Sequence, residues 1–228
     1  MSRPNQMAKQ TKPRPERRLP LSRERVLRAA IKLADKGGIE ALSMRKLARE
    51  LGVEAMSLYN HVANKEEILD GITEVVASEV DLPPAGADWK TAIRQSAIST
   101  RDVFLRHPWA CSLSMSRQGG GSARLQRGDW MLRTLREAGL SKDLTYHAFH
   151  IVESHILGFT LQQLNFPYEE EELAGVAATF IEQLPADEYP DFVEHVMQHL
   201  EPSHGDEGGF EFGLDLILDG LERLRDTG

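Results

Sequence analysis

The sequence predicts an all-α protein, and three observations lead to that prediction. Ser22 can cap a first helix, and from there onward apolar residues recur at helical spacing almost everywhere, beginning with Val26, Leu27 and Ala30. Glycine and proline residues separate these segments, as the pair Gly37–Gly38 does at the end of the first one. No strand-like alternation, hairpin signal or internal repeat stands out along the 228 residues.

Two short amphipathic helices are expected to meet at a turn that contains Gly52. Ser43 can cap the first helix, which runs through Leu51, and the second helix buries Leu58 and Val62. The second helix leaves mostly small and polar side chains on its outer face: Glu54, Ala55, Ser57, Tyr59, Asn60 and His61. This is the plan of a helix-turn-helix, whose second helix enters the major groove of DNA. We therefore expect the chain to bind double-stranded DNA.

The distribution of charge supports DNA binding, although the whole chain has a net charge of −8. Residues 1–65 contain 15 lysines and arginines against 6 aspartates and glutamates, whereas the remainder contains 12 against 29. A basic end on an acidic body is expected when one domain approaches phosphates and the rest stays away from them. Residues 1–20 are basic and rich in proline, so we expect a disordered arm. That arm either follows the DNA backbone or minor groove, or it is a solubilising tail.

The rest of the chain is expected to continue as helices. Asn64 can cap a helix from Lys65 to about Val80, and the segment from Leu82 to Gly86 marks a boundary. These signals divide the chain into a helix-turn-helix domain (21–68), a connecting helix and linker (69–85), and a larger C-terminal domain (86–228). We expect helices in that domain at 88–106, 108–117, 122–138, 142–165, 170–183, 187–200 and 210–226.

The last helix carries a pattern for packing against other helices. Phe210, Leu214, Ile217, Leu221 and Leu224 are separated by alternating steps of four and three residues. Together with the helix at 142–165, two copies would form a four-helix interface, and glycines beside the seam would let the helices approach closely. The residues expected at this interface are Ile151, Gly158, Gly213, Ile217, Gly220 and Leu221. The alternative is that both helices pack inside one subunit.

A cavity for a small-molecule effector is expected among the helices from 88 to 165, with mostly apolar walls and few polar groups. Its expected lining is Phe104, Trp109, Met115, Trp130, His147, His150 and Glu153, although the aromatic residues can equally belong to an ordinary core. The histidines and Glu153 also suggest a competing function, a metal-dependent enzyme or metal sensor, because imidazole and carboxylate bind Zn²⁺ and Fe²⁺. Their spacing drifts around the helix and lacks a histidine pair four residues apart, so polar lining is the favoured interpretation.

Several other features restrict the class of protein. Cys111 is the single cysteine, so no intramolecular disulfide forms, and its expected role is that of a small buried apolar residue. No apolar run approaches the roughly 20 residues of a membrane span, and the basic N-terminus lacks the apolar region of a secretory signal. We expect a soluble, cytoplasmic protein that is not an enzyme, uses no cofactor or metal and does not act at a membrane.

Residues 21–70 resemble the DNA-binding domain of the TetR (tetracycline-repressor-like) family of bacterial regulators. Leu42 to Ala48 is similar to the family's second helix, Gly52–Val53 to its turn, and Leu58 to Lys65 to its third helix and the entry to the fourth. The C-terminal domain is similar to one branch of the family at His107–Trp109, Leu135–Gly139 and Phe210–Leu221. The resemblance implies a homodimer of nine or ten helices per subunit. It also implies binding to a palindromic operator, with release by a small molecule, and favours repression.

The resemblance also implies which residues contact DNA. Ser43 and Arg45 would touch a phosphate or a base edge at the start of the family's second helix. The exposed early positions of the recognition helix are Glu54, Ala55, Met56, Ser57 and Tyr59, and His61 and Lys65 would hold backbone phosphates. Ala55 and Met56 depart from the residues of the tetracycline repressors and offer apolar contact only, so a different operator sequence is expected. Tyr59 as half-buried core and His61 as an exposed bystander remain the alternatives.

Overall fold

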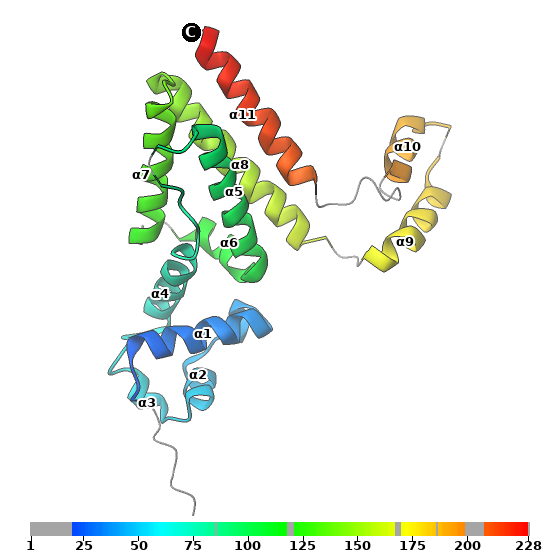
Figure 1. The fold of residues 1–228 in the computed structure, drawn as a ribbon. Helices are drawn as coiled ribbons and strands as arrows, with labels where there is room; N and C mark the ends of the chain where they lie inside the picture. The colour runs from blue at the N-terminus through cyan, green and yellow to red at the C-terminus, as the bar shows by residue number, and fades with distance from the viewer. Residues whose placement is uncertain are drawn as a thin grey trace, which may run out of the picture.

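The computed structural model describes residues 20–84, 86–117, 121–166, 170–185, 187–198 and 208–227. These residues form eleven α-helices, one short 3-10 helix and no strand, which confirms the all-α prediction (Figure 1). The predicted arm lies outside the described residues except for Pro20. The helices are α1 (Arg23–Gly37), α2 (Met44–Leu51), α3 (Ala55–Leu58), α4 (Lys65–Ala77), α5 (Trp89–Arg106), α6 (Pro108–Ser116), α7 (Ser122–Glu137), α8 (Lys142–Leu164), α9 (Glu170–Gln183), α10 (Pro190–Gln198) and α11 (Gly209–Thr227), with η1 (Ile39–Ala41) after α1.

Side-chain caps start three of the four N-terminal helices, as the sequence predicts. Ser22 Oγ accepts a hydrogen bond from the N–H of Arg25 at 3.2 Å, and Ser43 Oγ accepts one from Lys46 at 3.3 Å. Asn64 Oδ1 accepts from the N–H of Glu67 at 2.9 Å. Each bond satisfies one of the N–H groups that a helix start leaves without an internal partner.

Helix α3 is shorter than the sequence predicts. The expected helix reaches Val62, but α3 ends at Leu58, and the chain continues in turns held by N–H groups of His61 and Val62 that donate to the carbonyl of Leu58 at 2.9 and 3.0 Å. Gly52 ends α2 with a φ of 66° and a ψ of 38°, the left-handed conformation that glycine adopts without strain. The helix-turn-helix is therefore a helix, a left-handed turn and a single helical turn.

The helix-turn-helix has a core to which the C-terminal domain also contributes. Residues of α1 to α4 fill its centre, and all of them are fully or almost fully buried: Val26, Ala30, Leu47, Leu58, Val62, Ile68 and Ile72. Val103 of α5 and Trp109 and Ala110 of α6 belong to the same cluster. The two domains are therefore packed together at this point, and they are not joined by the linker alone.

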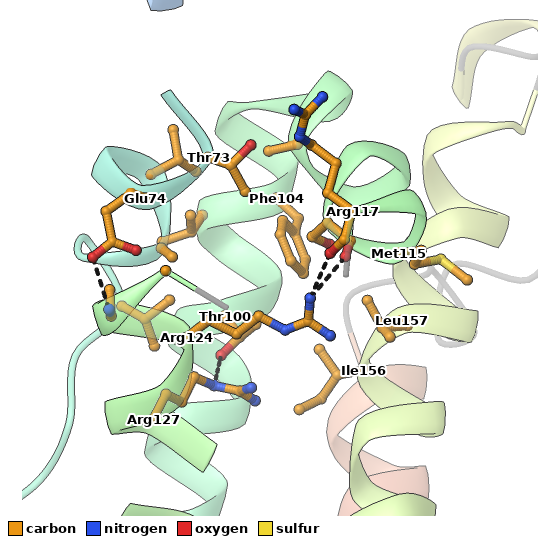
Figure 2. A pocket seen from close by; sticks show the side chains of 18 of the residues that line it. Thr73, Glu74, Thr100, Phe104, Met115, Arg117, Arg124, Arg127, Ile156 and Leu157 are labelled. Atoms are coloured by element: carbon orange, nitrogen blue, oxygen red, sulfur yellow. Dashed lines mark hydrogen bonds between the residues drawn. The ribbon is translucent and has the colours of Figure 1, made fainter. Parts of the chain in front are cut away.

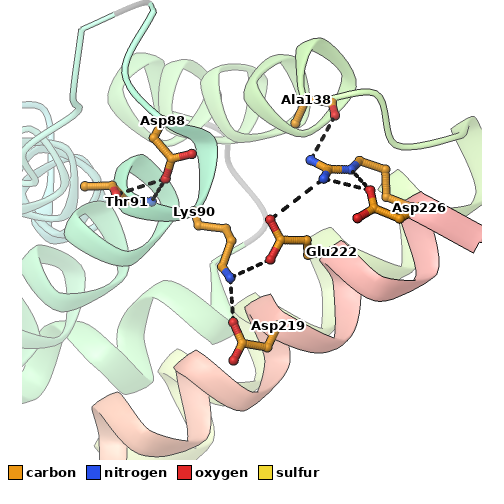
Figure 3. Close-up of polar contacts among 8 residues, drawn as sticks. Asp88, Lys90, Thr91, Ala138, Asp219, Glu222 and Asp226 are labelled. Atoms are coloured by element: carbon orange, nitrogen blue, oxygen red, sulfur yellow. Dashed lines mark hydrogen bonds and ion pairs between the residues drawn. The ribbon is translucent and has the colours of Figure 1, made fainter.

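A second core lies between α5, α7, α8 and α11. Its centre consists of Met131, Leu135, Val152, Ile156, Phe210, Leu214 and Leu218, each at most 1% exposed. Polar contacts at its rim hold α11 in place (Figure 3). Lys90 of α5 donates to Asp219 at 2.5 Å and to Glu222 at 2.9 Å, and these carboxylates raise the pKa of Lys90. The segment that follows Glu137 is held by Arg225, which donates to the carbonyl oxygen of Ala138 at 3.5 Å.

Helices α9 and α10 lie to one side of this body (Figure 1). α9 has the predicted bounds, whereas α10 begins at Pro190 and not at 187. The two helices contact each other, with the rings of Phe180 and Phe192 6.2 Å apart. Both rings are 44–48% exposed, so this helix pair presents apolar side chains to its surroundings.

We predict that Gly52→Ala destabilises the protein by about 1 kcal/mol, because a Cβ at a positive φ is strained whatever space surrounds it. Gly175→Ala in α9 is the matched control. It has no positive φ and no neighbour within 4 Å of an added Cβ, so it should leave stability unchanged or raise it. Urea unfolding followed by circular dichroism measures both. Equal stability of Gly52→Ala and the wild type would contradict the prediction.

Candidate DNA-binding surface and ligand cavity

The residues expected to contact DNA belong to α3, to the starts of α2 and α4 and to the turns beside them, and these elements lie at one end of the molecule (Figure 1). Met56 is 74% exposed and Tyr59 is 47% exposed, and Glu54 and Arg45 are exposed as well. Ser43, Ala55, Ser57, His61 and Lys65 are partly exposed. Tyr59 is thus half-buried, as its alternative role requires, and its exposed half is open to DNA. Ser43 uses its hydroxyl as the cap of α2, so that oxygen already has a partner in the absence of DNA.

Lys65 is the first residue of α4, directly after the cap residue Asn64. Glu67 folds back over this helix start, where its carboxylate accepts from the N–H of Ala63 at 2.7 Å and from Arg23 at 3.3 Å. The bond from Ala63 and the Arg23 contact lower the pKa of Glu67. The start of α4 is thus tied to the turn that follows α3, and the two present one surface.

A cavity of about 380 Å³ lies between α4, α5, α6, α7 and α8 (Figure 2). Apolar groups form much of its wall: Val76, Ala77, Val80, Val103, Phe104, Ala110, Met115, Ile156 and Leu157. Met115 and Arg124 are exposed, so the cavity opens beside α6 and α7. A space of this size with mostly apolar walls suits a small organic molecule.

Charged side chains line the same cavity and are mostly paired with each other. Arg127 donates to Glu153 at 2.7 Å and to the hydroxyl of Thr100 at 3.1 Å. Arg117 contacts Asp70 at 2.7 Å, and these contacts with α4 carboxylates raise the pKa of Arg117. None of the arginines of the cavity wall was among the residues expected from the sequence. The spacing of Arg124 and Arg127, three residues apart on one helix face, is the signal that could have identified them.

Three of the seven residues expected to line the cavity do so in the structure, and four lie elsewhere. Phe104, Met115 and Glu153 do line it. The remaining four, which do not, are Trp109, Trp130, His147 and His150. Trp130 packs against the second core and donates from Nε1 to the carbonyl of Pro83 at 3.1 Å, which ties the linker to α7.

Trp109 joins the two domains instead of lining the cavity. It is 7% exposed, and its Nε1 donates to Asp35 of α1 at 2.7 Å. The ring of His107 contacts the same carboxylate oxygen at 2.7 Å and lies 3.4 Å from Glu79. α6 is therefore held to α1 by a largely buried polar contact, and α6 also contributes the cavity residues Ala110 and Met115.

The residues of the competing metal hypothesis do not form one site. His147 and His150 are exposed on α8, where their rings lie 5.4 and 4.6 Å from the ring of Tyr146. Glu153 faces the cavity and pairs with Arg127. The described part of the chain contains no group of three or more His, Cys, Asp or Glu side chains arranged to hold a metal ion. Cys111 is fully buried, and burial raises the pKa of its thiol to about 11, as expected of an unreactive core residue.

The residues expected at the dimer interface fall into two groups. Leu221 is 4% exposed and belongs to the second core, and Gly213 lies against His155 of α8, whose Cε1 would be 2.7 Å from an added Cβ. These two residues therefore serve packing within the subunit. Ile151 is 47% exposed, Gly158 is exposed, and Ile217 and Gly220 are partly exposed. The same outer surface of α11 carries Phe212, Leu216 and Leu224, each 55–68% exposed.

A helix-turn-helix at one end and a ligand-sized cavity in a helical body define a class of protein, the transcriptional regulators that bind DNA in response to small molecules. The model of the tetR family of bacterial regulatory proteins matches residues 26–72, and that of the tetracycline repressor-like C-terminal domain matches residues 82–225. The chain belongs to the TetR family of bacterial transcriptional regulators. The metal-dependent alternative has no support among these similarities.

Individual proteins show the same similarity over most of their length. The transcriptional repressor DrrR1 of Streptomyces coeruleorubidus is 34% identical over 217 residues, which cover 90% of this chain and 78% of the repressor. ActR of Streptomyces coelicolor, solved in complex with actinorhodin, has a TM-score of 0.74 at 27% identity and covers 91% of this chain and 99% of its own. BioQ, solved with its natural double-stranded DNA operator, has a TM-score of 0.62 at 26% identity over 89% of this chain and 98% of its own. No helix in the described ranges is long and apolar enough to cross a membrane.

Proposed function

We propose that this protein is a homodimeric repressor that leaves a palindromic operator when a small apolar or aromatic effector enters the cavity. The observation that carries this proposal is the position of α4. Its first residue, Lys65, belongs to the surface expected to contact DNA, and Thr73, Val76 and Ala77 of the same helix line the cavity. With 13 residues, α4 is about 20 Å long. A ligand that displaces the cavity wall therefore displaces the DNA-contacting end.

A second connection supports the same coupling. Ala110 and Met115 of α6 line the cavity, while Trp109 of α6 donates to Asp35 of α1. Both helices that frame the helix-turn-helix are thus connected to the cavity: α4 forms part of its wall, and α1 is held to α6, which forms another part. Two recognition helices fit successive major grooves only at a separation of about 34–36 Å, or a multiple of it, so a small tilt in each subunit weakens DNA binding.

Known relatives favour this assignment. BioQ binds a double-stranded operator, and ActR binds actinorhodin, a small molecule, on a fold like that of this chain. DrrR1 is a repressor. The mostly apolar wall of the cavity, with Phe104 as its aromatic member, favours an effector with an apolar or aromatic body.

The dimer would form through the outer surface of α8 and α11. Ile151 and Gly158 of α8 and Phe212, Leu216 and Leu224 of α11 leave this surface apolar and exposed in the single chain. Gly220 has no neighbour within 4 Å of an added Cβ, so a helix of the second copy has room to approach it closely. Burial of such a surface against its own copy stabilises a symmetric dimer.

We predict that Arg45→Ala and Lys65→Ala weaken operator binding and make it less dependent on salt. Each lost phosphate contact should reduce the slope of log K against log salt by about one unit, or about two for the dimer. Fluorescence anisotropy of a labelled operator at several salt concentrations measures the slope. Lys142→Ala, an exposed lysine at the start of α8, is the control and should leave the slope unchanged. If the slope is unchanged in Arg45→Ala and Lys65→Ala as well, these two residues do not contact the DNA phosphates.

We predict that Leu216→Glu yields monomers, because a dimer interface would bury an unpaired carboxylate in each subunit. Leu216 is 55% exposed in the single chain, so its replacement should not disturb the core. Leu125→Glu is the matched control, since Leu125 of α7 is 63% exposed and lies outside the proposed interface. Sedimentation velocity measures the mass of each variant. If Leu216→Glu sediments as a stable dimer, the interface lies elsewhere.

We predict reciprocal coupling between effector and operator. An effector that weakens operator binding by a given factor must itself bind more weakly to the operator complex by the same factor. Titration of a panel of aromatic compounds with and without operator, followed by anisotropy and calorimetry, measures both factors. A compound that occupies the cavity with equal affinity in the two states would refute the switch. Turnover of a compound would instead support an enzyme.

A further inference from the structure

Glu74 of α4 places a carboxylate oxygen without a partner in the wall of the cavity. Its Oε2 is buried and accepts no hydrogen bond from any described residue, and Glu74 is one of the cavity-lining residues (Figure 2). The other oxygen, Oε1, accepts from Ser122 Oγ at 2.5 Å and from the N–H of Ala123 at 2.8 Å. A buried acceptor that stays unpaired is unfavourable, so the oxygen is a strong candidate for a bond with a ligand.

Glu74 also lacks the positive partner that the neighbouring carboxylates have. In the described part of the cavity wall, Asp70 pairs with Arg117, and Glu153 pairs with Arg127. Arg124, the third arginine of the wall, donates to the backbone carbonyls of Ser114 and Arg117 at 3.2 and 2.9 Å. Among the described residues, the hydrogen-bond donors to Glu74 are neutral and lie at the N-terminal end of α7. In the part of the chain that the structure describes, the partial positive charge of a helix start therefore lies beside the Glu74 carboxylate, and no full cation pairs with it.

The position of the Glu74 carboxylate depends on Gly121. A Cβ at residue 121 would lie 1.9 Å from Glu74 Oε2, so any larger residue there would push the carboxylate aside. Gly121 has a φ of −61° and a ψ of 156°, which every residue type can adopt, so its backbone does not require glycine. The structure therefore gives one reason for a glycine at position 121: a side chain there would occupy the space of the Glu74 carboxylate.

We propose that Glu74 recognises the effector through a hydrogen-bond donor, and that the donor it fits best is a protonated amine on an aromatic or other apolar body. This inference rests on the proposed function, because it names the chemical class of the effector for the same cavity. A protonated amine would supply both the missing hydrogen bond and the missing positive charge, and hydrogen bonds between charged groups are the stronger kind. The apolar side chains of Val103, Phe104 and Ile156 would take the body of the molecule.

The location of Glu74 links this recognition to DNA binding. Glu74 belongs to α4, and its present bonds to Ser122 and Ala123 attach α4 to the start of α7. An amine bound to Oε2 would draw the carboxylate toward the ligand and so stretch the bonds that Oε1 accepts from Ser122 and Ala123. The attachment of α4 to α7 would then weaken. Glu74 lies nine residues after Lys65 on α4, so the change would reach the end of the helix that is expected to contact DNA.

The test uses matched ligands that differ only in the group offered to Glu74. 1-Naphthylmethylamine, 1-naphthalenemethanol and 1-ethylnaphthalene, together with the corresponding pyrene compounds, carry an ammonium, a hydroxyl and a methyl group of similar size. We expect affinity for the full-length protein to fall in that order, with the amine bound at least about tenfold more tightly than the ethyl compound. Displacement of labelled operator should follow the same order.

Glu74→Gln is the decisive variant. Its amide oxygen can still accept from Ala123, while its NH₂ group repels an ammonium donor, so the preference for the amine should disappear. Glu137→Gln, on α7 and outside the cavity lining, is the matched control at an exposed position and should keep the preference. If Glu74→Gln fails to fold, as judged by circular dichroism, Gly121→Ala displaces the carboxylate by a different route and should also lower the affinity for the amine.

The outcomes separate this inference from the proposed function. If the ethyl compound binds as tightly as the amine, or if Glu74→Gln keeps the preference, the recognition by Glu74 is refuted. A protein that still released operator with such ligands would remain a ligand-controlled repressor. If no compound of either series binds or releases operator, the inference fails together with the apolar or aromatic effector of the proposed function.

Discussion

The structure depends on the shared use of helix α4 by two parts of the molecule. On one face, Ile68, Leu69 and Ile72 close the core of the helix-turn-helix, and on another, Thr73 and Glu74 form the wall of the cavity. The internal hydrogen bonds of an α-helix make a short helix move largely as one body. Movements of the surface expected to contact DNA and of the cavity wall are therefore coupled through α4, and the other contacts between the two domains add to this coupling.

The contact of Trp109 and His107 with Asp35 adds a second point of attachment. A carboxylate that accepts from a buried indole and contacts an imidazole is costly to disrupt, because each group would lose its partner in a poorly solvated place. The core of the helix-turn-helix also joins the two domains, since it contains Val103 and Ala110 of the C-terminal domain beside residues of α1 to α4. The helix-turn-helix is thus packed on the body through α4 and α6 together.

Several residues that the sequence marks as functional have a different place in the fold. Phe210, Leu214 and Leu221 follow the spacing of a helix seam, but they pack on α5, α7 and α8 of the same subunit. Spacing shows that a helix has an apolar stripe, and it does not show which helix covers it. In the same way, aromatic composition suggested Trp109 and Trp130 for the cavity, whereas their indole N–H groups bond Asp35 and Pro83. The partners of these groups lie 74 and 47 residues away in the sequence, beyond any local pattern.

Local signals in the sequence by themselves determined the helical class, the caps Ser22, Ser43 and Asn64, the turn at Gly52 and the helix-turn-helix. These features arise from hydrogen bonds and apolar spacing within a few residues, which a sequence displays directly. Only the tertiary structure decided the early end of α3, the charged lining of the cavity and the unpaired oxygen of Glu74. The cavity lining and the unpaired oxygen depend on which distant side chains meet: Glu74 and Gly121 approach because α4 packs beside α7, and nothing in either segment alone specifies that contact.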